Sequence, residues 1–475
     1  MQIVKRIAPA ALLLLAALSL LALASMSSPL YPTNIWGDAN CLLTVGRAMK
    51  AGRVLYRDIY EQKGPTLYLA HELAAWISDR SFLGVYLVEA LCLTGFLLAA
   101  RRLLLRRSPA ASAASILCAA LILGSRAFCR GDSAEEFCLP FAMTALALTD
   151  GVWRAHGVPL PPRRLLALGL LAGIVASVKF TLLGVFLGLC LCEGLFALKA
   201  GGPVRALKSA GIFLLGMALP ILFWIAYFAA QGALDDAYRA YLYNNLFLYA
   251  GKGRVTLLQA KAFLRGNFLW VLPTLGGVAA FLSDRRETAA ARAACALSFV
   301  AQLLAVLLPG RVWAYSLLAV APYALYGTRF VAEALHRRLP RACLPLAIVL
   351  SLAICFASPN AFLRGVPYEQ TAQHRLAAQI PPGSSVLQAS FLDDGLYLAT
   401  GTIPEEKYFV LLNVELPAMR EALDGALEAR RPDYVLMSFR TLPERFQGYE
   451  LVASDAGYLD DNRLGKWFSL YKRSP

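Results

Sequence analysis

Apolar runs of about 15 to 20 residues recur along this chain and constrain its fold more than any other feature. As an α-helix, such a run crosses or nearly crosses the roughly 30 Å hydrocarbon core of a bilayer. The composition agrees, because 58% apolar residues over 475 positions is too many for a soluble enzyme of this length. The sequence therefore predicts a polytopic α-helical membrane protein with about eleven transmembrane helices. We place them at 7–25, 82–100, 109–124, 138–152, 165–178, 180–198, 209–229, 267–283, 293–309, 313–331 and 342–358.

The basic residues orient these spans, because they gather in every second connection and cytoplasmic loops carry such an excess. The pattern fits an odd number of spans with the N-terminus in the cytoplasm of a multi-pass cytoplasmic-membrane protein. Loops 26–81, 125–137 and 230–266 and the tail 359–475 then face outward. The residues concerned are Lys5, Arg6, Arg101, Arg102, Arg106, Arg107, Arg154, Arg163, Arg164, Lys199, Arg205, Lys208, Arg285, Arg286, Arg292, Arg337, Arg338 and Arg341.

The net charge of +15 follows largely from this topology, and a polybasic inner surface favours anionic membrane lipid. No stripe of basic and aromatic residues suggests a groove for bases, so we expect no nucleic-acid partner. Most of the ten cysteines lie inside apolar spans, and the four histidines are scattered. Neither a disulfide framework nor a zinc site is predicted.

The chain divides into a transmembrane domain, 1–358, and a small outer domain, 359–475. Segment 7–25 resembles a cleavable signal peptide, but we favour an uncleaved span because the polar loop after it needs anchoring beside the others. In the tail, short strands at 385–389 and 434–438 flank a segment with helical spacing at 417–430. This order predicts a small extracytoplasmic α/β unit.

The outer loop after the first span carries charges at a membrane surface, where charges are costly and indicate chemistry or ligand binding. Residues 38–51 and the segment from Pro65 predict two short interfacial helices. Asp38 either caps the first of them or faces an outward cavity as a base or metal ligand, and spacing favours neither. Asp58 fits a turn or a salt bridge with a neighbour. Lys63 fits ordinary anchoring somewhat better than pairing with a lipid phosphate.

The next outer loop, 125–137, packs two arginines and several carboxylates between two spans. It is either a solvated cap or a second wall of the same site, with Arg126 or Arg130 on phosphate and Asp132 or Glu135 on sugar or metal.

Further along, Lys179 and Arg311 lie between apolar segments, where a snorkelling side chain is the simple interpretation. A common anionic ligand would nevertheless explain all the basic residues on the side where topology does not call for them. These are Lys63, Arg126, Arg130, Lys179 and Arg311.

Asp38 after the first span, followed by the Tyr56-Arg57-Asp58 and Lys63-Gly64-Pro65 segments, resembles the GT-C glycosyltransferases. These polytopic enzymes are related to protein mannosyltransferases and lipid A aminoarabinose transferases. Residues 130–137 look like that family's second outer loop, and the tail around 393–397 is similar to the small outer domain of many bacterial members. Many relatives carry an Asp-Glu pair where this sequence has Asp38-Ala39, which leaves a metal requirement open.

The resemblance implies transfer of a sugar from a polyprenyl-phosphate donor to an envelope lipid, polysaccharide or protein outside the cytoplasmic membrane, with inversion. Asp38 would be the base, and Asp58 or Glu135 would orient the sugar or acceptor. A divalent metal ion on Asp38 is the one cofactor considered. The cations for the leaving phosphate would be Lys63, Arg126, Arg130 and Arg311.

Two other functions compete with this one. A transporter or flippase of a lipid-linked saccharide would use the same outer cations, but it needs charged or broken spans at mid-membrane, for which Lys179 is the nearest case. A catalytically inactive scaffold whose tail binds a partner is the third.

Overall fold

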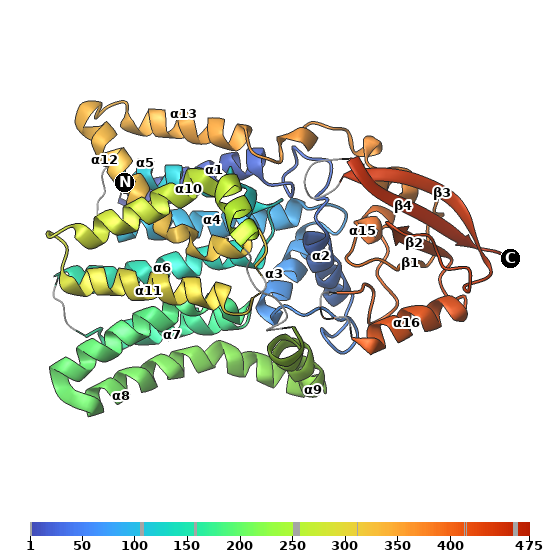
Figure 1. Ribbon diagram of the computed structural model, residues 1–475, viewed down its shortest axis with the longest axis horizontal. Helices are drawn as coiled ribbons and strands as arrows, with labels where there is room; N and C mark the ends of the chain where they lie inside the picture. The colour runs from blue at the N-terminus through green and yellow to red at the C-terminus, as the bar shows by residue number, and fades with distance from the viewer. Residues whose placement is uncertain are drawn as a thin grey trace.

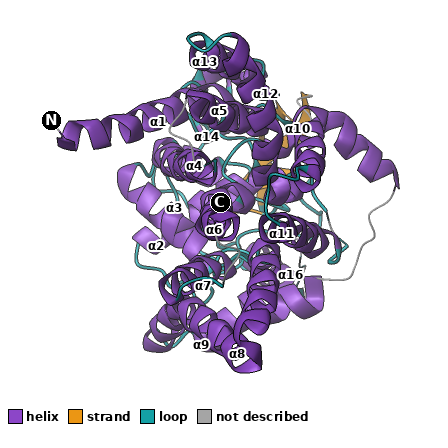
Figure 2. Ribbon diagram, turned by 90° about the vertical axis from the view of Figure 1, so that its left-hand side faces the viewer, coloured by secondary structure: helices purple, strands orange, loops and turns teal. Residues whose placement is uncertain are grey.

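The computed structural model describes residues 2–104, 109–155, 159–249, 257–310, 312–412, 414, 416–458 and 464–475. Long helices form a bundle, and a four-stranded sheet lies at one end of it, with two short helices between (Figure 1). Seen along the bundle, α6 lies near the middle, and α7, α8 and α9 lie together on one side (Figure 2). At the end of the bundle that faces the sheet, the ends of several long helices therefore lie next to the two short helices.

Each predicted span has a helical counterpart in the bundle. Predicted spans 180–198 and 209–229 are the two helical segments of α8, which the non-helical backbone of Gly201 and Gly202 separates; Gly202 adopts a φ of 70° that glycine tolerates best. The chain reverses there, because the Ser209 hydroxyl lies 3.2 Å from the Glu193 carboxylate. Predicted span 313–331 begins instead as a 3-10 helix, η4 (Ser316–Tyr323). The bundle helices are α1 (Gln2–Ala24), α4 (Leu83–Leu103), α5 (Pro109–Leu123), α6 (Ala134–Ala155), α7 (Pro162–Ala176), α8 (Gly184–Ala230), α10 (Leu257–Ser283), α11 (Ala289–Leu307), α12 (Ala324–Arg338) and α13 (Cys343–Phe356).

Length and composition alone qualify four helical segments among the described residues to cross a membrane. They are Leu83–Leu103, Gly184–Ala230, Phe263–Ser283 and Ala289–Leu307, while Ala10–Ala24, Pro109–Leu123 and Cys343–Phe356 are shorter apolar helices. These are the helices of a membrane protein, and the number of about eleven spans stays a prediction.

Between bundle and sheet lie the two short helices that the sequence predicts, α2 (Gly37–Lys50) and α3 (Pro65–Ile77). Pro65 takes the first position of α3, where its missing N–H costs nothing. The helices pack closely: a Cβ on Gly46 would lie 2.5 Å from the backbone of His71. Nearly all of α2 is buried, so it does not lie on an open interface as expected; the C-terminal part of the chain covers it.

Short elements complete the end of the bundle that faces the sheet. They are η1 (Arg126–Phe128), η2 (Phe180–Leu182), α9 (Leu234–Ala237) and the π-helix η3 (Tyr238–Tyr249). The segment after α13 contains η5 (Ala361–Leu363), η6 (Tyr368–Gln370), α14 (Ala372–Ala377) and α15 (Leu396–Thr400).

The sheet has the order β1-β2-β4-β3, in which β1 (Val386–Gln388) and β2 (Tyr434–Ser438) are parallel. The helix α16 (Pro417–Glu428) connects these two strands, so the strand–helix–strand order predicted from the sequence is confirmed. The hairpin of β3 (Tyr449–Tyr458) and β4 (Leu464–Arg473) was not predicted and adds two antiparallel pairings.

A polar contact docks this part of the chain on α2. The hydroxyl of Thr44 donates to the buried carboxylate of Asp393 at 2.6 Å, and Gln388 donates to its other oxygen at 2.8 Å. The Arg47 guanidinium donates to the carbonyl of Tyr397 at 3.0 Å. The second half of α2 is thereby held against the C-terminal part of the chain.

Candidate functional site

A buried ion pair joins the first turn of α2 to the loop before α3. The ammonium of Lys63 lies 3.0 Å from the Asp38 carboxylate and 3.2 Å from the Glu61 carboxylate. Burial lowers the pKa of Lys63, but the two carboxylates outweigh it and raise that pKa above its ordinary value. Lys63 therefore stays charged at any physiological pH. Two of the three ammonium hydrogens face carboxylates, which leaves the third for another anion.

A second ion pair lies at the N-terminus of α6. Lys179, in the turn between α7 and η2, lies 2.7 Å from Oε1 of Glu135. The Glu135 side chain is 1% exposed, and its Oε2 has no hydrogen-bond partner among the described residues. It lies in the first turn of α6, at the positive end of the helix dipole.

Tyr315 connects the two ion pairs. Its hydroxyl lies 3.4 Å from Oδ2 of Asp38, and the Lys179 ammonium lies 5.5 Å from the centre of its ring. The ring of Trp36 meets that of Tyr315 edge to face at 5.2 Å. Two lysines and two carboxylates from distant parts of the chain thus gather around one aromatic ring.

Backbone contacts fix the spacing between the two lysine-bearing loops. The N–H of Gly64 donates to the carbonyl of Val178 at 2.9 Å, and the N–H of Thr66 donates to that of Ser177 at 3.0 Å. A Cβ on Gly64 would lie 2.2 Å from the Ser177 carbonyl oxygen, so no larger residue fits there. Lys63 and Lys179 flank this contact directly.

A large apolar groove begins beside these loops. Its volume is about 1040 Å³, and α7, α8, α9 and η3 line it, together with Pro65 and Ser177 from the lysine loops. Its lining residues are Tyr56, Pro65, Ala176, Ser177, Phe180, Leu183, Met217, Ile221, Trp224, Ile225, Phe228, Leu234, Asp235, Ala237, Tyr238, Tyr241, Leu242 and Leu246. An apolar groove whose wall includes residues next to both lysine-bearing loops suits the hydrocarbon chain of a lipid with an anionic head.

Of the residues predicted from the sequence, Asp38, Lys63 and Glu135 come together with Lys179. Asp58 lies in a turn, where Arg57 binds its carboxylate at 2.8 Å and the N–H of Val54 donates to it. The Arg57 guanidinium lowers the pKa of Asp58 to about 2. This is the turn and salt-bridge role that the sequence had left open.

The predicted arginines lie elsewhere or outside the described residues. Arg130 is buried, donates to Asn360 at 2.8 Å and lies 5.4 Å from the ring centre of Phe362. Arg126 is exposed, with its side chain near Gly266. Arg311 is not among the described residues. The phosphate-binding role of these three arginines stays a prediction.

The sequence did not identify Glu61 or Tyr315 as members of the site. For Lys179 it favoured a turn residue whose side chain snorkels to the membrane surface. Glu61 is fully buried, which its loop sequence does not signal. The carbonyl contacts of Gly64 are likewise invisible in the sequence. The one signal in the sequence was a lysine and a carboxylate on the predicted outer side of the membrane, where the topology does not call for charged residues.

The arrangement does not fit a divalent metal ion on Asp38. An ammonium group lies against each of the Asp38 and Glu135 carboxylates, where it would repel a dication. Within the described part of the chain, no group of three or more His, Cys, Asp or Glu side chains is placed to hold a metal ion.

Comparison with solved structures identifies the fold. The crystal structure of ArnT from Cupriavidus metallidurans in the apo state has a TM-score of 0.62 with this chain at 10% identity, covering 99% of this chain and 98% of that one. ArnT from the same organism bound to undecaprenyl phosphate gives 0.61 at 13% identity, with the same coverage. The apo oligosaccharyltransferase of Archaeoglobus fulgidus, at 0.46, is too dissimilar to add to the argument. The GT-C fold expected from the sequence is therefore confirmed.

A search of curated protein sequences finds no match. A family model, by contrast, matches most of the membrane part, over residues 2–341. With that extent of agreement, the chain belongs to the family of the competence-induced protein Ccs4 N-terminal domain.

Proposed function

We propose that this protein is a membrane glycosyltransferase that moves a sugar from a polyprenyl-phosphate donor to an acceptor hydroxyl outside the cytoplasmic membrane. The observation that carries the proposal is the pair of lysine–carboxylate contacts around Tyr315, on loops that also contribute Pro65 and Ser177 to the apolar groove. ArnT, which has the same fold, has been crystallised with undecaprenyl phosphate, and this supports a donor of that lipid class.

The donor would lie with its prenyl chain in the groove and its phosphate between Lys63 and Lys179. A branched hydrocarbon chain gains from leaving water for aromatic and aliphatic walls. Each ammonium retains hydrogens beyond those facing its own carboxylate, so both can donate to phosphate oxygens. Placed this way, the anomeric carbon lies near Asp38.

In the reaction, the Asp38 carboxylate removes the proton from the acceptor hydroxyl as that oxygen attacks the anomeric carbon. A bond forms between acceptor oxygen and anomeric carbon, and the bond from that carbon to the phosphate oxygen breaks. Its electron pair leaves on the polyprenyl phosphate, whose charge Lys63 and Lys179 neutralise. The proton ends on Asp38, and direct displacement inverts the anomeric configuration.

Glu135 is better placed than Asp58 to orient the sugar. Its buried Oε2 has no partner among the described residues and would accept a sugar hydroxyl, whereas Arg57 and the backbone engage the carboxylate of Asp58. The site would face outward and the N-terminus would lie in the cytoplasm, as the basic residues predict.

Reconstitution in proteoliposomes tests this function against transport. Wild-type protein would be supplied with polyprenyl-phosphate sugars labelled on the sugar, together with an extract of envelope acceptors. We expect the label to leave the prenyl lipid and appear on the acceptor. Label that changes leaflet while it remains on the prenyl phosphate would contradict the proposal and indicate a flippase.

A further inference from the structure

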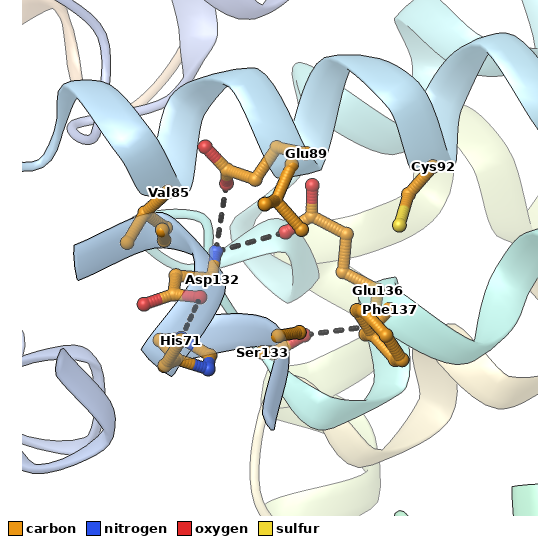
Figure 3. A pocket seen from close by; sticks show the side chains of 11 residues that line it. His71, Val85, Glu89, Cys92, Asp132, Ser133, Glu136 and Phe137 are labelled. Carbon is orange, nitrogen blue, oxygen red and sulfur yellow. Dashed lines mark hydrogen bonds and ion pairs between the residues drawn. The ribbon is translucent and has the colours of Figure 1, made fainter. Parts of the chain in front are cut away.

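Four buried ionisable side chains gather behind the candidate site, and the mechanism above does not use them. They are His71 on α3, Glu89 on α4, Asp132 in the loop before α6, and Glu136 in the first turn of α6 (Figure 3). None is more than 7% exposed. They line a cavity of about 20 Å³, which has room for about one water molecule.

The contacts of His71 fix the number of protons on its pair with Asp132. One ring nitrogen, Nδ1, lies 2.8 Å from the Leu67 carbonyl, and the other, Nε2, lies 2.8 Å from Oδ1 of Asp132. The Leu67 carbonyl can only accept, so Nδ1 carries a hydrogen. Between Nε2 and Oδ1 of Asp132, one of the two atoms must carry a hydrogen. Burial lowers the pKa of His71, but the Asp132 carboxylate and the Leu67 carbonyl outweigh it and raise that pKa. Burial also raises the pKa of Asp132, so the pair holds one proton between the His71 ring and the Asp132 carboxyl.

The two glutamates also share a proton. The backbone N–H of Asp132 lies 2.9 Å from an oxygen of Glu89 and 2.9 Å from an oxygen of Glu136 (Figure 3). Two carboxyl groups gathered around one N–H, and joined to each other by a hydrogen bond, do not both ionise away from water. Ser25 donates to Glu89 as well, at 2.9 Å. One proton between the glutamates would relieve the repulsion between two carboxylates held this close together away from water.

The cluster holds a strained loop. Cys129 and Asp132 have φ values of 58° and 67°, in a region that side chains other than glycine rarely adopt. Between them, a Cβ on Gly131 would lie 2.6 Å from a carboxylate oxygen of Glu89. Such a backbone persists only where its surroundings hold it, and here the two glutamates hold the Asp132 N–H.

The same cluster reaches both ion pairs of the site. Glu136 follows Glu135 directly, and its N–H is capped by the Ser133 hydroxyl at 3.0 Å, so the start of α6 is fixed from the cluster side. On the other side, His71 belongs to the helix that begins two residues after Lys63.

We infer that His71, Asp132, Glu89 and Glu136 form a proton-dependent lock that positions Glu135 against Lys179, and that these four are positioning residues for the transfer reaction. This inference rests on the proposed function for its catalytic consequence only. When the shared proton is lost, two carboxylates repel across the Asp132 N–H, the loop 125–133 loosens, and Glu135 moves from Lys179. The lock therefore holds at lower pH and opens as the pH rises.

The other titratable groups near the cluster are few. Cys92 of α4 lines the cavity, and the Asp38–Lys63 pair acts on His71 and Asp132 through its charges. Lys63 keeps its charge at alkaline pH because carboxylates surround it. The shared carboxyl proton is then the group whose loss opens the lock.

Hydrogen exchange of the full chain, followed by mass spectrometry, tests the lock without donor or acceptor. In wild type, segment 125–137 should lose protection at alkaline pH, after correction for the intrinsic rate, by about ten-fold or more. Glu136→Gln keeps an oxygen for the Asp132 N–H and a permanent N–H for Glu89, so it should keep this protection at alkaline pH. Glu193→Gln, a buried glutamate that Leu160 and Ser209 bind elsewhere, is the matched control and should behave as wild type.

The lock would be overturned if wild type showed no alkaline loss, or if Glu136→Gln lost protection as wild type does. Glu89→Gln gives the same test from the other partner and covers the case in which one variant does not fold. In the transfer assay, Glu136→Gln should extend activity to alkaline pH, whereas Glu136→Ala should lower kcat about ten-fold with little change in the donor KM. Absence of transfer with this exchange pattern intact would reject the proposed function and leave the lock standing.

Discussion

Two lysines of the candidate site lie largely buried beside carboxylates. Lys63 is 14% exposed and Lys179 is 28% exposed, and each contacts a carboxylate that is itself buried. Burying charge costs free energy unless it is paired, so the pairs are retained for a purpose other than stability. Under the proposed function, binding of the donor phosphate between the two ammonium groups would be that purpose.

Replacing either lysine should weaken donor binding. Lys63→Arg and Lys179→Arg should raise the KM for a polyprenyl-phosphate sugar by about ten-fold or more, because a well-aimed hydrogen bond to phosphate is lost. Arginine is chosen at both positions because methionine would leave Asp38, Glu61 and Glu135 buried without a cation. Lys50→Met, at a partly exposed lysine paired with Asp79, is the control. An unchanged KM in both site variants would contradict the assignment.

At the scale of elements, the site depends on how closely two loops approach. The loop before α3 and the turn after α7 are joined through backbone hydrogen bonds at Gly64 and Thr66. Gly64 has an ordinary φ of −77°, so the demand for glycine there is steric rather than conformational. The distance between Lys63 and Lys179 follows from this approach.

Adding one methyl group at Gly64 should therefore reduce transfer. The new Cβ would lie 2.2 Å from the Ser177 carbonyl oxygen, so Gly64→Ala must separate the loops and move the lysines apart. We expect transfer to fall by about ten-fold or more, since small misplacements of binding groups are costly. Gly194→Ala, where the structure has open space, should leave the rate unchanged. Equal rates for both variants would show that the loop contact is unimportant.

The groove gives a second prediction at this scale. Met217→Trp fills part of the groove, whereas Leu219→Trp lies on the same helix with an exposed side chain and does not line it. The first substitution should raise the KM for long-chain donors and spare a short-chain analogue, and the second should do neither. Measurement of both variants against donors of two chain lengths decides the point. Equal effects on long and short donors would place the prenyl chain elsewhere.

For the whole molecule, the C-terminal part serves as a cover for α2 and thus for Asp38. Asp393 accepts hydrogen bonds from Thr44, Gln388 and the N–H of Gly395, all within the buried contact. Burial raises the pKa of Asp393, and these three donors offset that rise only in part. The carboxyl is thus a junction between the membrane bundle and the sheet.

Removing this junction should loosen both parts together. Asp393→Ala leaves buried donors unpaired, which costs about 2 to 3 kcal/mol, and should lower the unfolding temperature and increase hydrogen exchange in α2. Asp424→Ala, which removes an ion pair with Arg445 at the surface of the same part, should change neither measurement appreciably. If exchange in α2 stayed unchanged in Asp393→Ala, the cover would not be what holds Asp38 in place.

The sequence predicts the helices and strands of this molecule better than the contacts between them. Hydrophobic periodicity and Pro65 place the bundle helices and the start of α3, because these features act locally. The contacts of Tyr315 with Asp38 and of Lys179 with Glu135 span large separations in the sequence, and no local pattern encodes them. Ser133 and Glu136 do carry a local signal, because their spacing is that of a helix cap. The local pattern does not show that Glu136 and Glu89, on another helix, both accept from the N–H of Asp132.

The proposed role of Asp38 as the base of a glycosyl transfer is tested most directly by a single-turnover assay. Purified protein in lipid nanodiscs is first loaded with labelled polyprenyl-phosphate sugar, and the acceptor is then added. Asp38→Asn should bind the donor as wild type does and transfer the label about 10² to 10⁴ times more slowly, and Asp79→Asn should match wild type. Transfer by Asp38→Asn at the wild-type rate would contradict the account.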